Sequence, residues 1–435
     1  MLTLFAMTGL AARPAQALPA FAAQTGQPCQ MCHVGGFGPQ LTPYGRNFKI
    51  HGYTQRANGF TIPFSAMAEG SFVHTAKDQA PPAHYAPNNN TTLDQISLFF
   101  AGGFGQHLGA FVQATWDGVA RAFTWDNLDV RTVTSVKLGT HDVALGASLN
   151  NNPTLTDPWN TLSAWGFPYT GSNLAPSPSA SPLLNGAFAQ TSLGATAYAW
   201  IDNAFYVEGG AYGSPGATSL RRLGSDPTVP GDIDGLAPYG RIAYQRASGG
   251  GTVQIGAFVM DESIHPGLDR ATGQTDHYTD AGLDGSYYRV LPNKDVITFN
   301  ARYMREQQAL HASCTLAGGD ANCARNHLND VRADVSYYWR NKIGGTIQVF
   351  NTTGNTNRFL FPANRTFRPD TTGLLLQLDG TPFGDQPQPA RRANLRMGVQ
   401  YTLYTSFNGA ATNFDGAGAK ASDNNTVRLF TWFAF

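Results

Sequence analysis

The stretch NLRMGVQYTL, residues 394–403, shows the pattern that decides the fold of this chain. Its odd-numbered positions are apolar or aromatic, and its even-numbered positions are polar or glycine. Because successive side chains of a β-strand point to opposite faces, this alternation predicts a strand with one apolar and one polar face. The stretch also has the length of a strand that crosses an outer membrane, about ten residues.

Other segments repeat the two-residue period, namely residues 297–303, 331–340 and 427–435. The polar positions include charges of both signs, such as Arg332 and Asp334. In a soluble sandwich the apolar set would face a core, whereas facing charges of both signs on the polar set suit the wet lumen of a barrel. The pattern therefore favours a β-barrel whose apolar face contacts lipid.

The connections between the expected strands alternate between short and long, as they do in outer-membrane barrels. The expected short turns are Gly105–Gly109, Lys137–Asp142, Asp202–Asn203, Arg246–Gly251, Leu291–Asp295 and Asn341–Gly345. The expected long connections are residues 76–91, 151–186, 213–236, 263–276, 308–327, 352–370 and 407–424. Residues 380–392 break the pattern, because a short turn is expected there and the segment is long. We predict an all-β antiparallel barrel of about sixteen strands between Phe60 and Phe435, in a bacterial outer membrane.

Composition agrees with this class. Charged residues make up 13% of the chain, about half of the usual share. The net charge is +0, which gives no electrostatic case for binding nucleic acid. No apolar run reaches the roughly 18 residues of a membrane-spanning helix, so strands are the remaining way to cross a bilayer.

The start of the chain has the features of an export signal. Residues 2–12 (LTLFAMTGLAA) are an apolar run, and Ala15-Gln16-Ala17 matches a cleavage site. We therefore expect residues 1–17 to be a signal peptide, residues 18–57 a separate segment, and residues 58–435 the barrel.

The segment 18–57 contains CQMCH, residues 29–33, which is the attachment motif of a c-type haem. Thioethers join Cys29 and Cys32 to the haem vinyl groups in such a motif, and His33 binds the iron as an axial ligand. A zinc site would need further ligands, and no second C-x-x-C or H-x3-H lies nearby. A redox dithiol would open a helix in a βαβ unit, and a simple disulfide would leave His33 unexplained. We predict one covalent haem c.

At about 40 residues, the haem segment is too short to bury a core of its own. We therefore expect a plug that packs inside the barrel or against its periplasmic mouth. Arg46 and Lys49 are candidates for contacts with the haem propionates, or else solvated surface charges. The sixth iron ligand is left open between His51, Met67 and a five-coordinate iron.

Two further cysteines, Cys314 and Cys323, flank a Gly- and Asp-containing stretch (CTLAGGDANC). In an exported chain they are expected to form a small loop disulfide, the alternative being two free surface thiols.

The chain resembles the fused monohaem cytochrome–porins of iron-oxidising bacteria, the outer-membrane Fe(II) oxidase family. The similar residues are 22–53 (AAQTGQPCQMCHVGGFGPQLTPYGRNFKIHGY), 151–169 (NNPTLTDPWNTLSAWGFPY) and 423–435 (DNNTVRLFTWFAF). The resemblance implies outer-membrane electron transfer from extracellular Fe(II), or another donor, through one haem to a periplasmic c-type cytochrome. We carry over no iron-docking residues from this resemblance, and electron transfer of this kind needs no nucleophile or proton-transfer residue.

Three alternatives remain at this stage. The same parts could export electrons to an external acceptor, or the chain could be a diffusion porin whose haem is structural. A soluble cytochrome with a β-sandwich body is the third.

Overall fold

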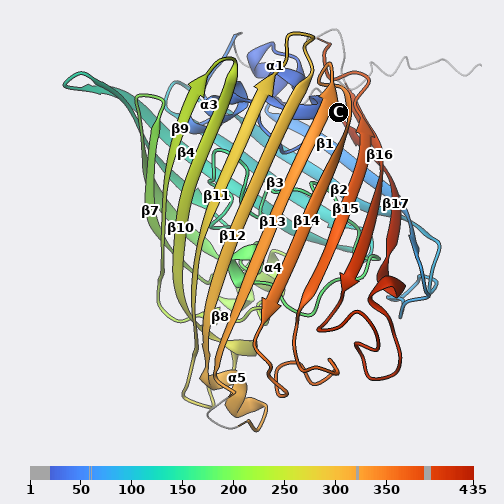
Figure 1. Cartoon of the computed structure of the whole chain (residues 1–435). Helices are drawn as coiled ribbons and strands as arrows, with labels where there is room; N and C mark the ends of the chain where they lie inside the picture. The colour runs from blue at the N-terminus through green and yellow to red at the C-terminus, as the bar shows by residue number, and fades with distance from the viewer. Residues whose placement is uncertain (1–19, 58, 60, 320–322, 387–392) are drawn as a thin grey trace, which may run out of the picture.

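A computed structural model describes residues 20–57, 59, 61–319, 323–386 and 393–435. The expected signal peptide, residues 1–17, lies outside the described residues. Among those described, the sheet has 17 strands, of which β8 (Asp232–Ile233) is a short pairing at the edge of β10. The other sixteen strands form one closed antiparallel barrel, which confirms the predicted fold (Figure 1).

The barrel closes because the last strand pairs with the first, from Met67 opposite Ala434 to Thr75 opposite Thr426. Its strands are β1 (Phe64–Thr75), β2 (Asn90–Gly103), β3 (Leu108–Asp117), β4 (Ala122–Leu138), β5 (His141–Asn150), β6 (Leu193–Ile201), β7 (Phe205–Gly213), β9 (Ala237–Ser248), β10 (Gly251–His265), β11 (Asp276–Val290), β12 (Val296–Leu310), β13 (Arg325–Trp339), β14 (Ile343–Gly354), β15 (Thr371–Gly380), β16 (Asn394–Ser406) and β17 (Thr426–Ala434).

The helices are short and lie at the two ends of the barrel or within it. They are α1 (Ala20–Thr25), α2 (Cys29–Cys32), α3 (Pro43–Ile50), α4 (Ala217–Arg222) and α5 (His311–Leu316), with 3-10 turns η1 (Val34–Gly36), η2 (Leu183–Asn185), η3 (Pro266–Leu268) and η4 (Ala421–Asn424). In Figure 1, α1 and α3 lie at the end that holds the C-terminus, and α5 and β8 lie at the opposite end with the long connections. None of the helices in the described part of the chain is long and apolar enough to cross a membrane.

β1 begins at Phe64, later than the expected start of the barrel at Phe60, which lies outside the described residues. The alternation of short turns and long connections is present, with one departure. The connection between β3 and β4, Gly118–Arg121, is a tight turn although it lies at the end with the long connections. The Asp117 carboxylate accepts the N–H groups of Val119 and Ala120, which explains how four residues suffice there. Residues 387–392 of the long 380–392 connection lie outside the described residues.

The two faces of the wall follow the predicted period. On β13, Val331, Val335 and Tyr337 are exposed on the outer face, whereas Asp334 and Ser336 are buried on the inner one. Several of the inward charges are held in ion pairs with a neighbouring side chain of opposite charge. These pairs are Arg131–Asp129, Arg241–Asp284, Arg302–Asp330, Arg396–Asp379 and Arg428–Glu69.

The connection between β5 and β6, residues 151–192, folds into the lumen and is called the inner loop below. Thr154, Asp157 and Leu162 of this loop are completely buried. The loop reaches the opposite wall, where Gln348 of β14 donates to the Phe167 carbonyl at 2.8 Å and Gln400 of β16 donates to the Thr170 carbonyl at 3.2 Å. The inner loop therefore spans the lumen from β5 and β6 to β14 and β16.

Candidate functional site

Residues 20–57, called the inner segment below, lie within the end of the barrel that carries the short turns. The Gly35 N–H donates to Asn341 Oδ1 in the β13–β14 turn at 2.7 Å. The Gln30 N–H donates to the Gly384 carbonyl after β15 at 3.0 Å. On another part of the wall, the Gly103 N–H at the end of β2 donates to Gln24 Oε1 at 2.8 Å. The segment is thus fastened to strands on several sides of the lumen.

The motif CQMCH folds as one short helical turn, α2, followed by His33 in extended conformation. Cys29 and Cys32 are three residues apart and therefore share a face of this turn. The next helix, α3, begins after Thr42, whose Oγ1 accepts the Gly45 N–H at 3.2 Å and donates to the Met31 carbonyl at 2.5 Å. Thr42 therefore caps α3 and ties it to α2.

Gly45 permits the close approach of α3 to the motif. A Cβ atom at this position would lie 2.4 Å from the carbonyl oxygen of Cys32. Since that oxygen belongs to the backbone, it could not move aside without shifting the motif itself. Glycine is required here for space rather than for a special backbone conformation.

A cavity of about 450 Å³ lies between the inner segment, the wall and the inner loop, and Cys29, Cys32 and His33 all line it. Its volume falls within the range of small-molecule and cofactor sites. The aromatic and other apolar residues that line it include Phe37, Leu41, Phe48, Met67, Phe99, Phe111, Trp165 and Trp432. The motif thus faces a largely apolar cavity.

The motif side chains have few partners: Cys29 is hydrogen-bonded to the side chain of Asn394, and His33 is hydrogen-bonded to the backbone of Gly38. Cys29 and Cys32 are free thiols, and the buried Nδ1 of His33 has no hydrogen-bond partner. Burial raises the pKa of the Cys29 thiol and raises the pKa of Cys32 to about 12. Burial also lowers the pKa of His33 to about 4. No group of three or more metal-ligating side chains occurs within the described residues, so a conventional zinc cluster does not account for the motif.

These residues fit a covalently attached haem. Two thiols on one helical face, an adjacent imidazole with an unpartnered nitrogen, and an apolar cavity reached by all three are the requirements of a haem c site. Cys29 and Cys32 would hold the vinyl positions, and His33 would be the axial ligand.

The candidates for the sixth ligand are separated by the structure. Met67 of β1 points inward, is 7% exposed and lines the same cavity as His33. His51, at the end of α3, does not line this cavity, and its Nδ1 is hydrogen-bonded to the Asn47 carbonyl at 2.8 Å.

The two candidates for propionate contacts also differ. Lys49 lines the cavity, but its ammonium already donates to the carbonyls of Leu155 and Asp157 at 2.8 and 2.6 Å and to Asn160 Oδ1 at 2.8 Å. Burial lowers its pKa to about 7. Arg46 is buried with Nε and Nη1 unpartnered, yet it is not among the residues that line the cavity.

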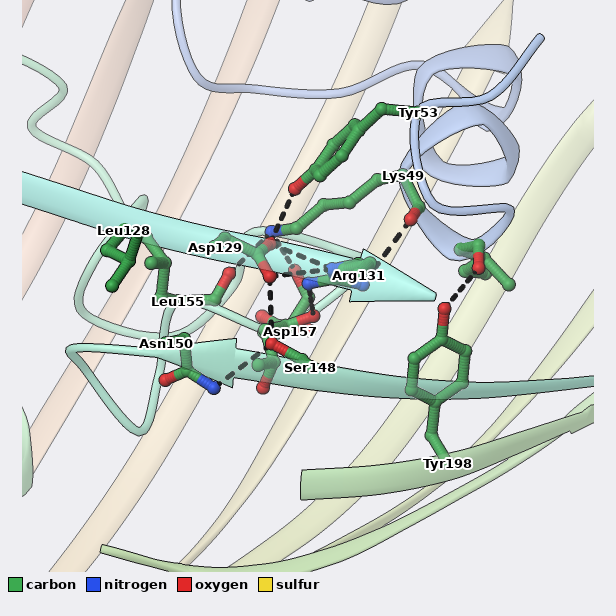
Figure 2. A network of polar contacts seen from close by, with 12 residues as sticks. Lys49, Tyr53, Leu128, Asp129, Arg131, Ser148, Asn150, Leu155, Asp157 and Tyr198 are labelled. Atoms are coloured by element: carbon green, nitrogen blue, oxygen red, sulfur yellow. Dashed lines mark hydrogen bonds and ion pairs between the residues drawn. The ribbon is translucent and has the colours of Figure 1, made fainter. Parts of the chain in front are cut away.

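Figure 2 shows the network that joins the inner segment to the wall and the inner loop. Arg131 of β4 forms an ion pair with Asp129 at 2.8 Å and donates to the carbonyls of Lys49 and Thr156 at 3.3 and 3.0 Å. The Tyr53 hydroxyl donates to Asp129 Oδ2 at 2.6 Å, and the Tyr198 hydroxyl donates to the Ile50 carbonyl at 2.5 Å.

Neither Asp129 nor Arg131 is among the site residues predicted from the sequence. The available signal was an acid and a base two positions apart within one strand, which places both on the same face. This spacing does not predict which residues in the lumen Asp129 and Arg131 contact.

At the far end of the barrel, Cys314 and Cys323 form the predicted disulfide. Both are buried beside Leu310 and Ala324, so the bond closes α5 over the end of β12.

A closed barrel with an apolar outer face, a polar lumen and short turns at one end is the architecture of an outer-membrane protein of the porin type. No protein-family model and no curated protein sequence matches this chain.

Solved structures with a similar fold include three outer-membrane proteins. OmpT of Vibrio cholerae, folded in vitro, is 10% identical with a TM-score of 0.42, over 86% of this chain and 96% of that one. The anion-selective porin from Comamonas acidovorans is 12% identical with a TM-score of 0.45, over 86% and 98%. The outer membrane channel DcaP of Acinetobacter baumannii is 13% identical with a TM-score of 0.45, over 88% and 99%.

Proposed function

We propose that this protein transfers electrons across the outer membrane by means of a single covalent haem c held in the barrel lumen. The observation that supports this most directly is that Cys29, Cys32 and His33 line one apolar cavity between the inner segment and the barrel wall. The short-turn end of such barrels faces the periplasm, so the cavity would lie near the periplasmic side.

When bound, the haem would supply one-electron redox chemistry between an outer-face donor, Fe(II) in our proposal, and a periplasmic acceptor such as a c-type cytochrome. The chain's own residues bind and shield this group. The Cys29 and Cys32 thiols would attach it, His33 would bind the iron, and Phe37, Phe48 and Trp432 would help to exclude water from the cavity they line. No nucleophile or proton-transfer residue is needed for this reaction.

The barrel matters because the hydrocarbon layer is about 30 Å thick. A redox group attached to a soluble periplasmic domain would leave this whole distance to an outer-face donor. The inner segment lies inside the barrel end instead, with Arg131 of β4 and Arg396 of β16 hydrogen-bonded to its backbone. This position shortens the path to the outer face.

The proposal is tested with the full-length protein purified from outer membranes. A c-type absorption spectrum that persists after denaturation, together with reduction of the haem by Fe(II), is expected. Absence of covalent haem, or a haem that Fe(II) does not reduce, would overturn the Fe(II) proposal. A redox titration fixes the direction, because a haem potential below that of the Fe(II) donor would favour electron export.

The second candidate is a diffusion porin with a structural haem, which the closed barrel and its polar inner face favour. The inner segment and inner loop occupy much of the lumen, so we expect conductance far below that of an open porin in planar bilayers. Open-porin conductance by the haem-loaded protein would support the second candidate.

A further inference from the structure

We infer that Met67 is the second axial ligand of the haem iron and that Trp432 positions its sulfur. This inference rests on the proposed function and goes beyond it, because it names the second ligand of the iron and the residue that orients that ligand. It starts from two neighbouring strands, β1 and β17, which close the barrel.

Both side chains point into the lumen. Met67 lies opposite Ala434 and Trp432 lies opposite Glu69, so Met67 and Trp432 are diagonal neighbours across the closing strand pair. They are 7% and 6% exposed, respectively. The Trp432 Nε1–H donates to the Met67 sulfur at 3.0 Å. A thioether sulfur has two lone pairs, so this hydrogen bond fixes its orientation and leaves one pair for a metal.

Trp432 also contacts the inner segment. Its ring packs against Phe37, four residues after His33, with ring centroids 4.7 Å apart. Met67, Phe37 and Trp432 belong to one apolar cluster at this end of the cavity. The Met67 sulfur therefore lies beside Trp432, a wall residue that packs directly against the segment that carries the haem motif.

The other imidazole, thioether, amine and phenol groups of the described residues that line this cavity offer no better candidate. His33 is the only histidine and Met67 the only methionine among the described residues that line it. The Lys49 ammonium is held by three oxygen acceptors. The Tyr53 hydroxyl donates to Asp129. Tyr169 would have to ionise, and burial raises its pKa well above the usual value.

Sulfur ligation predicts a definite chemistry. A His/Met pair of axial ligands raises the reduction potential of a c-type haem relative to bis-histidine ligation. The Trp432 N–H should raise it further by withdrawing electron density from the sulfur. Such a haem would accept electrons from donors of relatively high reduction potential.

The test uses the full-length protein purified from outer membranes. Covalent haem is measured first, on denatured protein, and the ferric spectrum of native protein is then examined for the weak long-wavelength band of sulfur-to-iron charge transfer. We expect this band in the wild type, in His51→Ala and in the matched control Met304→Leu, which alters another buried methionine. We expect Met67→Leu to lose it and to bind added CO in the ferrous state.

Met67→His provides the rescue, with a six-coordinate spectrum and a potential below that of the wild type. Trp432→Phe should keep the band, since the ring packing remains, but lower the potential. Covalent haem without the band, or a band that survives in Met67→Leu, would overturn Met67 as the ligand and leave the proposed function standing. An unchanged potential in Trp432→Phe would overturn the positioning role. Absence of covalent haem in the wild type would instead overturn the proposed function, and the inference with it.

Discussion

The barrel wall and the inner segment are stabilised in different ways. Each wall strand is paired on both sides, and its side chains alternate between lipid and lumen. The inner segment contains helices of 6, 4 and 8 residues, none of which could be stable alone. Its backbone groups are held by wall residues such as Asn341, Asn394 and Arg396. The segment therefore depends on the wall, whereas the wall is complete without the segment.

This difference suggests a division of labour. The wall provides a rigid, membrane-embedded frame, and the inner segment carries the chemistry. Variants in the segment should then change haem content or the docking of the segment while the barrel persists. The predictions below test that separation, from the largest expected effect to the smallest.

Replacing both motif cysteines, Cys29→Ser with Cys32→Ser, should abolish covalent haem entirely. Since neither residue belongs to the wall, the barrel should still form. Haem staining of denatured protein measures the covalent haem, and the heat-dependent gel mobility of folded barrels shows whether the barrel has formed. Loss of the barrel along with the haem would show that the two regions fold as one unit.

A side chain at position 45 should disturb the motif next most strongly. In Gly45→Ala the new Cβ would meet the Cys32 carbonyl oxygen, and such overpacking typically destabilises by about 1–3 kcal/mol. We expect haem incorporation to fall several-fold. Gly59→Ala is the matched control, because a Cβ there would have no atom within 4 Å. Equal haem content in the two variants would contradict the close packing of α3 on α2.

Lys49→Met should loosen the inner segment without removing haem. It leaves the carbonyls of Leu155 and Asp157 without their buried donor, at a cost on the order of 3 kcal/mol. The measurement is protease cleavage within residues 20–57 of the folded protein, which should become faster. Lys137→Met, which alters a side chain that is 74% exposed in a surface ion pair, should leave cleavage unchanged.

The smallest effect on the inner segment should come from the far end of the barrel. Replacing Cys314 and Cys323 by serine removes the cross-link over α5 and should speed hydrogen exchange there. Haem content and potential should not change, because the disulfide belongs to the outer loops. A changed haem potential would mean that the loop end and the motif are coupled.

Sequence alone predicted the wall well and the inner segment poorly, for physical reasons. Alternation at residues such as Val335 and Ser336 records which side faces lipid, so strands and barrel class follow directly. The predicted pair Cys314–Cys323 is also short-range.

The cavity, by contrast, brings together Met67, Trp165 and Trp432 with the motif from four distant parts of the chain. No local sequence pattern predicts that residues so far apart in the chain line one cavity. His51 was a natural candidate ligand from its nearness in sequence, but the end of α3 leaves it outside the cavity. The tight turn between β3 and β4, Gly118–Arg121, was not predicted, because it depends on the carboxylate of a single residue, Asp117.

The most direct test of the account is the amount of covalent haem per chain in protein recovered as a folded barrel from outer membranes. It is measured by mass spectrometry of the intact denatured chain. The account predicts one haem attached through Cys29 and Cys32 to a chain that shows the heat-dependent mobility of a barrel. A folded barrel whose mass carries no haem would contradict it.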